Sequence, residues 1–263
     1  MIEKIARNLY LLYLVQIYAW KTQLAYRVQA VVWLVNFVAQ ALLTFVFISV
    51  IYSVSAGIPG WSYFEMLLLS SSTIMMMGLV NYFIDIYNIG QNLLAGDFDA
   101  QLARPVSAMT IMFSNFNGVT LIASFLTGLS IFAYAASHLS LTLGQLALFG
   151  LFFGMGTFIV MLFLIVLVMS SYKLFRGGAW VNWVTNTLSG ASKYPLSIYG
   201  TIGTLIFTFL VPLGFATYYP IEAITGKLSL YAMIAIFAGM LIFIVGLLKL
   251  FSHLFRSYSS GMG

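Results

Sequence analysis

Long apolar runs separated by short polar connections dominate the pattern of this chain. A helix needs about 20 residues to cross a hydrocarbon core of about 30 Å. Five runs meet that length clearly, at residues 28–52, 64–87, 109–136, 144–172 and 231–251. A sixth run, 197–218, is long enough but contains Pro212 and several threonines. The pattern predicts an all-α integral membrane protein with six transmembrane helices, in a single transmembrane domain over residues 1–263.

The N-terminal residues 1–27 do not fit this scheme. Their apolar stretch, 9–20, is too short to cross a membrane and has basic residues on both sides. Its tyrosines and Trp20 belong to the residue types that favour headgroup depth. We therefore expect an N-terminal helix that lies in the membrane interface. No small-residue cleavage site follows it, so we do not expect a removed signal peptide.

Lysine and arginine are unevenly distributed between the two sides of this arrangement. With the N-terminus inside, Lys227 is the one basic residue of the 11 that falls outside. The positive-inside rule therefore predicts cytoplasmic N- and C-termini. The inner connections, 88–108 and 173–196, are long enough to bind a partner, whereas the outer connections are short.

Composition supports the same class. The chain is 62% apolar and 6% charged, whereas a soluble domain carries about 25% charged residues. The formal net charge of +5 does not indicate nucleic acid as a partner, because the basic residues stand singly at the ends of apolar runs. The absence of cysteine excludes disulfides and thiolate metal sites.

Candidate catalytic groups are scarce. The two histidines, His138 and His253, fall in connections on opposite sides, so they cannot form a metal or catalytic pair. No acid falls near the middle of a predicted span, which disfavours an ion-coupled carrier. The sequence contains no Gly-rich phosphate loop. We expect no catalytic residue, metal or cofactor in this chain, and a transporter of this kind would need energy from another subunit.

The inner connection 88–108 mixes apolar and acidic side chains. Its apolar residues fit a short helix or turn, and its two aspartates fit the start of a second turn, where a helix dipole favours negative charge. Apolar residues in such a loop mark either a partner contact or contact with lipid. The pattern alone leaves both interpretations open.

This connection carries a family resemblance. Residues 96–106, GDFDAQLARPV, are similar to the short cytoplasmic motif of ABC-2 type permeases, in particular a branch of about this chain's length. Residues 193–199, KYPLSIY, resemble that branch's entry to the fifth span. Pro212 and residues 218–220, YYP, resemble its passage towards the last span. The resemblance covers nearly the whole chain in topology and three short stretches in motif.

The resemblance implies the permease subunit of an ATP-binding-cassette transporter, in a prokaryotic plasma membrane. It implies two separate ATPase subunits, which hold ATP and Mg, and a second permease chain, identical or homologous. It further implies export of a hydrophobic or amphipathic molecule by alternating access, with residues 88–108 as a coupling helix. The implied ATPase contacts are Gln91, Asn92, Leu93, Leu94, Asp97, Phe98, Asp99 and Leu102.

Polar and methionine side chains inside the predicted spans are candidates for a substrate path. They are Asn36, Gln40, Thr73, Met76, Met77, Thr204 and Thr208. Polar groups in spans also join helices by hydrogen bonds, and methionines also fill irregular packing, so both interpretations stay open. Close helix approach is expected at Gly78, Gly118, Gly128, Gly154 and Gly156.

Two other functions stay open at this point. One is a membrane scaffold or assembly subunit that transports nothing. The other is an ion-coupled secondary carrier, which the placement of the acids disfavours. Co-purification of an ATPase subunit separates the transporter from both.

Overall fold

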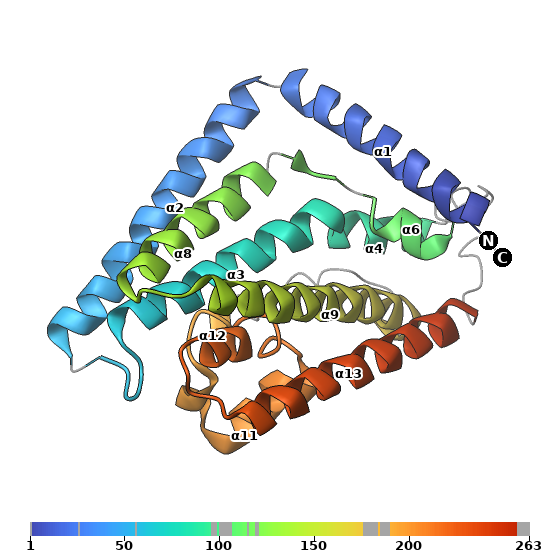
Figure 1. Cartoon of the computed structure of the whole chain (residues 1–263). Coiled ribbons are helices and arrows are strands. Elements are labelled where there is room, and N and C mark those ends of the chain that lie inside the picture. The colour runs from blue at the N-terminus through green and yellow to red at the C-terminus, as the bar shows by residue number, and fades with distance from the viewer. Residues whose placement is uncertain are drawn as a thin grey trace.

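The computed structural model describes residues 2–25, 27–55, 57–95, 99, 107–114, 116–118, 121–175, 184 and 190–256. Every regular element in these ranges is helical (Figure 1), which confirms the all-α prediction. The α-helices are α1 (Ile2–Ala25), α2 (Arg27–Val54), α3 (Tyr63–Phe83), α4 (Ile86–Ala95), α6 (Ala108–Met112), α8 (Leu126–His138), α9 (Leu143–Phe175), α11 (Gly200–Leu205), α12 (Tyr218–Ile224) and α13 (Leu230–Arg256). Three short elements are η1 (Leu121–Phe125, π), η2 (Leu196–Tyr199, 3-10) and η3 (Ile206–Leu210, π).

Within the described ranges, four helical segments are long and apolar enough to cross a membrane. They are Val31–Val54, Tyr63–Leu93, Leu143–Ser171 and Leu230–Arg256. They correspond to the first, second, fourth and last of the predicted spans. The protein is therefore an integral membrane protein whose longest helices follow the hydropathy pattern.

The predicted third span, 109–136, is not one continuous helix. Its chain leaves the helical path after α6, and Phe116 has a positive φ of 49°. The backbone N–H of Asn117 donates to the carbonyl of Tyr82 over 3.1 Å, at the end of α3. A bond to another helix therefore replaces a bond within the helix at this point, and α8 starts after it.

The predicted fifth span, 197–218, is helical only over Leu196–Leu210. Proline has no N–H to continue a helix, and the chain turns at Pro212. The N–H of Gly214 then donates to the carbonyl of Phe207, and that of Tyr219 to Gly214. These bonds fold α12 back beside η3, so we treat residues 190–224 as one unit, the 190–224 segment.

Helices α3 and α9 form the centre of the bundle. Helix α3 packs on α8 and α9, and α9 packs on α4, α12 and α13. Figure 1 shows α8 and α2 on one side of this pair and α13 on the other. Most of α2 is exposed, including Val31, Val35 and Leu42, as a surface in lipid or against a second chain would be.

Small residues allow the closest helix contacts. A Cβ on Gly128 of α8 would lie 2.9 Å from the carbonyl oxygen of Ser71 in α3, and a Cβ on Gly156 of α9 would lie 2.0 Å from that of Phe215. Gly78 and Gly118 also face close neighbours, so the glycine prediction is confirmed at four positions. It is wrong for Gly154, which is exposed and has no atom within 4 Å of a Cβ.

The helix predicted for residues 1–27 is present as α1. The side-chain amide of Gln16 donates to the hydroxyl of Tyr82 over 2.8 Å. A Cβ on Gly118 would lie 2.7 Å from the Trp20 ring. Helix α1 is therefore attached to the end of α3 that continues into α4.

Candidate functional site

The connection between α3 and α4 is a sharp but well-bonded bend. Ile84 is extended, with φ −128° and ψ 125°. The carboxylate of Asp85 then accepts from the backbone N–H of Asn88 over 3.0 Å and from its side-chain amide over 2.6 Å. An aspartate that accepts from an N–H three residues on is a helix N-cap. Asp85 therefore starts α4 directly after α3 ends.

Helix α4 has one buried and one exposed face. Ile86, Ile89 and Leu93 are buried at helical spacing, and α4 packs against α9. Asn88 and Gln91 are exposed on the other face. The buried face fixes α4 to the bundle, while the polar face stays open to a partner.

The predicted ATPase contacts divide between these faces. Gln91 is exposed and Asn92 is half-buried, whereas only 1% of Leu93 is exposed. In the single chain, Leu93 therefore holds α4 in place and is not accessible to a partner. Asp99 is half-buried, and the structure does not describe the side chain of Leu94. Asp97, Phe98 and Leu102 lie outside the described residues.

The middle of α3 binds the backbone of the 190–224 segment. The hydroxyl of Thr73 donates to the carbonyl of Ser192 over 2.8 Å, and that of Ser70 to Lys193 over 3.4 Å. Thr73 lies ten residues after the start of α3, about 15 Å along the helix. Since a non-helical backbone at this depth needs partners within the protein, the hydroxyls of α3 allow the segment to lie there.

Two further predicted path residues bond within the same segment. The hydroxyl of Thr204 donates to the carbonyl of Leu196 over 3.0 Å, and Thr208 shares a 2.9 Å hydrogen bond with the hydroxyl of Tyr219. Thr73, Thr204 and Thr208 thus all make hydrogen bonds that hold the 190–224 segment.

The remaining path candidates lie elsewhere. Asn36 is exposed and Gln40 half-buried on α2. Met76 is fully buried and Met77 half-buried on α3. The structure therefore brings the threonines to one segment and leaves the α2 and methionine candidates apart from it.

A polar and aromatic cluster lies at the end of the bundle opposite α4. The ammonium group of Lys227 forms an ion pair with Glu65 over 2.9 Å and donates to the carbonyl of Gly60 over 2.7 Å. The ring of Trp61 stacks at a tilt on Tyr218, with ring centroids 5.7 Å apart. We call Gly60, Trp61, Glu65, Tyr218 and Lys227, together with Glu222, the outer cluster, after the side on which the charge pattern predicts Lys227.

The sequence pattern identified Lys227 as an isolated outer cation but gave no partner for it. A signal for one partner was present in the Ser62-Tyr-Phe-Glu65 motif. This is a capping box, in which Glu65 accepts from the N–H of Ser62 over 2.7 Å and Ser62 accepts from that of Glu65. The box fixes the carboxylate of Glu65 at the start of α3, where Lys227 reaches it.

Glu222 of α12 lies outside the four membrane-spanning segments. Burial raises the pKa of its carboxyl above the ordinary value of 4.5. A hydrogen bond with Tyr218 and the charge of Lys227 act in the opposite direction and offset part of this effect. Glu222 is therefore an acid that takes up a proton more readily than a solvated one.

The described acidic and histidine side chains do not form a metal site. In the part of the chain that the structure describes, no group of three or more His, Cys, Asp or Glu residues could hold a metal ion. What the geometry provides instead is a mechanical connection, since α3 joins α4 at one end, the 190–224 segment in the middle and the outer cluster at the other end.

Comparison with known protein families gives a match over most of the chain. The family described as ABC-2 family transporter protein matches residues 38–261. No curated protein matches the chain, and no solved structure matches it. The match includes α3, α4, the 190–224 segment and the outer cluster.

Proposed function

The chain belongs to the ABC-2 family of transporter proteins, as the permease of an ATP-binding-cassette transporter, and we propose that it exports a hydrophobic or amphipathic molecule by alternating access. ATP and Mg are held by two separate ATPase subunits, and this chain has no catalytic role. A second permease chain, identical or homologous, completes the path. The membrane is a prokaryotic plasma membrane.

The observation that carries the coupling part of this proposal is the two-faced geometry of α4. Its buried residues Ile86, Ile89 and Leu93 pack on the bundle, while Gln91 remains exposed. A partner can contact α4 and the residues after it, at Gln91, Asn92, Leu94 and on to Leu102. Such a partner pushes on α4, which packs against α9 and is capped at the end of α3. Small shifts at such a contact are amplified when the packed elements have two discrete arrangements.

The orientation predicted from the charge pattern assigns the two ends of α3 to opposite sides of the membrane. With six crossings and cytoplasmic termini, α4 lies on the inner side and Lys227 on the outer side, and α1 lies in the inner interface. The 190–224 segment occupies the outer half of the fifth crossing. Movement of α3 is then transmitted to Ser192 and Lys193 at mid-depth and to Lys227 outside, where an exit would open.

An apolar or amphipathic substrate fits the interior of the spans. The polar groups at mid-depth in α3 are uncharged hydroxyls, and they bond to backbone carbonyls. Met77, which is half-buried four positions after Thr73 on α3, adds an adaptable apolar side chain. These uncharged groups of α3 favour a molecule that does not require an ionised partner on this helix.

Affinity purification from the native membrane tests the proposal. The tagged chain is extracted in a mild detergent, and mass spectrometry identifies what co-purifies. We expect an ATPase with a Gly-rich phosphate loop, and a homologous permease chain if the dimer is mixed. Recovery of an intact chain without any such ATPase overturns the proposal and favours a scaffold or a secondary carrier.

A further inference from the structure

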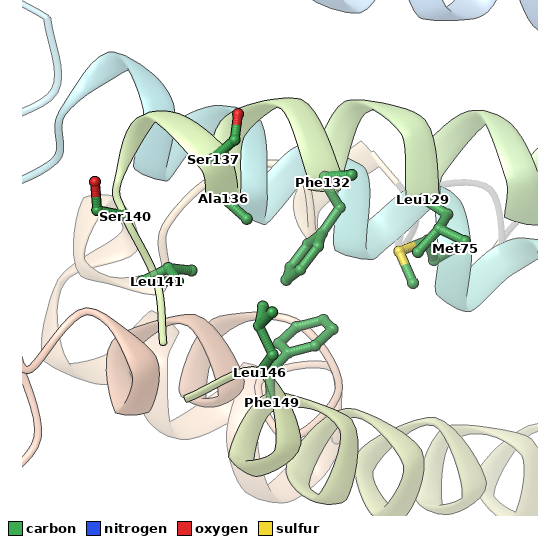
Figure 2. Close-up of a pocket in the computed structure, with 10 residues that line it drawn as sticks. Met75, Leu129, Phe132, Ala136, Ser137, Ser140, Leu141, Leu146 and Phe149 are labelled. Carbon is green, nitrogen blue, oxygen red and sulfur yellow. The ribbon is translucent and has the colours of Figure 1, made fainter. Parts of the chain in front are cut away.

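A cavity of about 660 Å³ lies between α8 and α9, apart from the threonine contacts and the outer cluster. Figure 2 shows Phe132 and Ala136 of α8 on one side, Leu146 and Phe149 of α9 on the other, and Met75 of α3 at the far end. Its volume is within the range of roughly 300–1,000 Å³ that is typical of ligand sites.

The cavity extends along the helices over about one leaflet. Met75 lies 12 residues after the start of α3, about 18 Å along the helix. Leu129 and Ser137 are eight positions apart on α8, about 12 Å. One leaflet of the hydrocarbon core is about 15 Å thick. The cavity therefore runs from the end near the α8–α9 connection to the middle of the membrane.

Apolar groups dominate the lining along this axis. Ser137 and Ser140 lie at the end near the connection, but their hydroxyl groups point away from Phe149, and that of Ser137 donates to the carbonyl of Tyr134. The deeper lining consists of aliphatic, aromatic and thioether side chains. None of the lining residues is charged. The site can thus accept a long apolar chain, but it has no ionic group to select a charged head.

The side of the cavity is accessible from the surface of the chain. Leu129 and Ala133 are exposed on α8, and so are the neighbouring large side chains Leu126 and Tyr134. The rings of Phe132 and Phe149, whose centroids are 4.3 Å apart, form the inner wall towards the core. A ligand can therefore enter sideways from the membrane without separating the core helices.

We propose that this cavity binds a single acyl chain of a membrane lipid from the leaflet next to the α8–α9 connection. The methyl end lies near Met75, and the ester region lies near Ser137 and Ser140. Recognition depends on the acyl chain and not on the lipid head group. The proposal requires that the protein lies in a membrane, and it is independent of the direction or substrate of transport.

The test uses the full-length protein in lipid vesicles. One preparation contains a phosphatidylcholine with a diazirine near the end of one acyl chain, and a second contains a phosphatidylglycerol with the same chain. After illumination and digestion, mass spectrometry locates the label. We expect label on residues 129–149 and on the peptide with Met75, at similar yield for both heads.

A matched pair of variants distinguishes the cavity from general lipid contact. Ala133 lines the cavity on α8, whereas Ala147 is exposed on α9 outside it. Ala133→Phe should reduce this label about ten-fold, since displacing two buried methylenes corresponds to about that factor. Ala147→Phe should leave it unchanged. Ser137→Phe at the mouth provides a second blocking variant if Ala133→Phe elutes as aggregate.

Several results of this experiment would overturn or replace the proposed acyl-chain site. Equal labelling in the wild type and both blocking variants, or no label on residues 129–149, overturns the proposal. Label that follows one head group replaces it with a head-group site. A photoreactive amino acid placed at position 133 that links to a second copy of the chain, with no lipid adduct in the labelling experiment, assigns the cavity to a protein interface instead.

Discussion

The ammonium group of Lys227 lies 3.8 Å from the centroid of the Trp61 ring. The same group bonds to Glu65 and to the carbonyl of Gly60. One lysine thus joins the connection before α3 to the connection before α13. A cation over an indole contributes about 0.5–1 kcal/mol at exposed sites, and an exposed ion pair adds about 1 kcal/mol or less.

Removing this charge should loosen the outer end of the bundle. Lys227→Met keeps the apolar stem and loses all three interactions of the ammonium group, so we expect a loss of about 1–2 kcal/mol in the free energy of unfolding. Thermal unfolding of the purified protein in detergent measures it. Lys227→Arg retains a cation and should recover most of the stability, and a Met variant as stable as wild type would show that the contacts contribute nothing.

The pH dependence of stability should report on Glu222. Because its pKa is raised in the folded protein, its favourable contribution is complete below the unfolded value, near 4.5, and is lost as pH rises through the folded pKa. Glu222→Gln resembles the protonated form at every pH. The unfolding midpoint of the variant should therefore rise relative to that of the wild type as the pH increases from about 4.5 towards neutral.

Taking the difference between the two proteins at each pH cancels the other titrating groups. A difference that is constant across this range would contradict the role given to Glu222. A difference that grows as pH falls would show that its pKa is lowered instead.

Two glycines two positions apart on α9 provide a matched test of packing. A Cβ on Gly156 would meet the carbonyl oxygen of Phe215 at 2.0 Å, whereas one on Gly154 meets nothing within 4 Å. Gly156→Ala should therefore cost about 1–3 kcal/mol, as overpacking does. Gly154→Ala should be neutral or slightly stabilising, because alanine favours a helix. Thermal unfolding compares them, and equal effects would refute the close approach of α9 to the 190–224 segment.

The α4 region should separate ATPase binding from folding. Leu94→Asp and Phe98→Asp should each reduce co-purification of the ATPase at least ten-fold, while the protein still inserts in the membrane. The reason is that a desolvated carboxylate costs more than the roughly 1.4 kcal/mol to which a ten-fold loss of affinity corresponds. Leu93→Asp serves as a contrast, because Leu93 is buried in the bundle and its variant should lose stability first. Unchanged complexes in both test variants would remove these residues from the contact.

Hydropathy predicted the elements that depend on length and apolarity alone. The four long segments follow the apolar runs because lipid requires continuous apolar helices. Hydropathy alone does not find the break in the third run, because it depends on a tertiary bond from Asn117 to Tyr82 of α3. The break in the fifth run follows Pro212, which the sequence shows, but the bond from Thr73 to Ser192 that holds the start of the segment joins residues 119 positions apart.

In the candidate sites, too, the sequence pattern identifies single residues but not their tertiary contacts. The charge pattern singled out Lys227, but Glu65 is far away in sequence and the ion pair is a tertiary contact. Leu93 was grouped with the partner contacts because it is apolar in an inner connection. Its spacing from Ile86 and Ile89 was the available signal that it belongs to a buried helix face.

The hydrogen bonds that hold the 190–224 segment have consequences for biosynthesis. Its carbonyls at Ser192, Lys193 and Ile224 accept from Thr73, Ser70 and Gln145, which all precede it in the chain. A short, interrupted helix leaves backbone groups without partners in lipid. The segment therefore cannot leave the insertion machinery for lipid by itself. We therefore expect it to enter the membrane together with α3 and α9, which provide these hydrogen bonds.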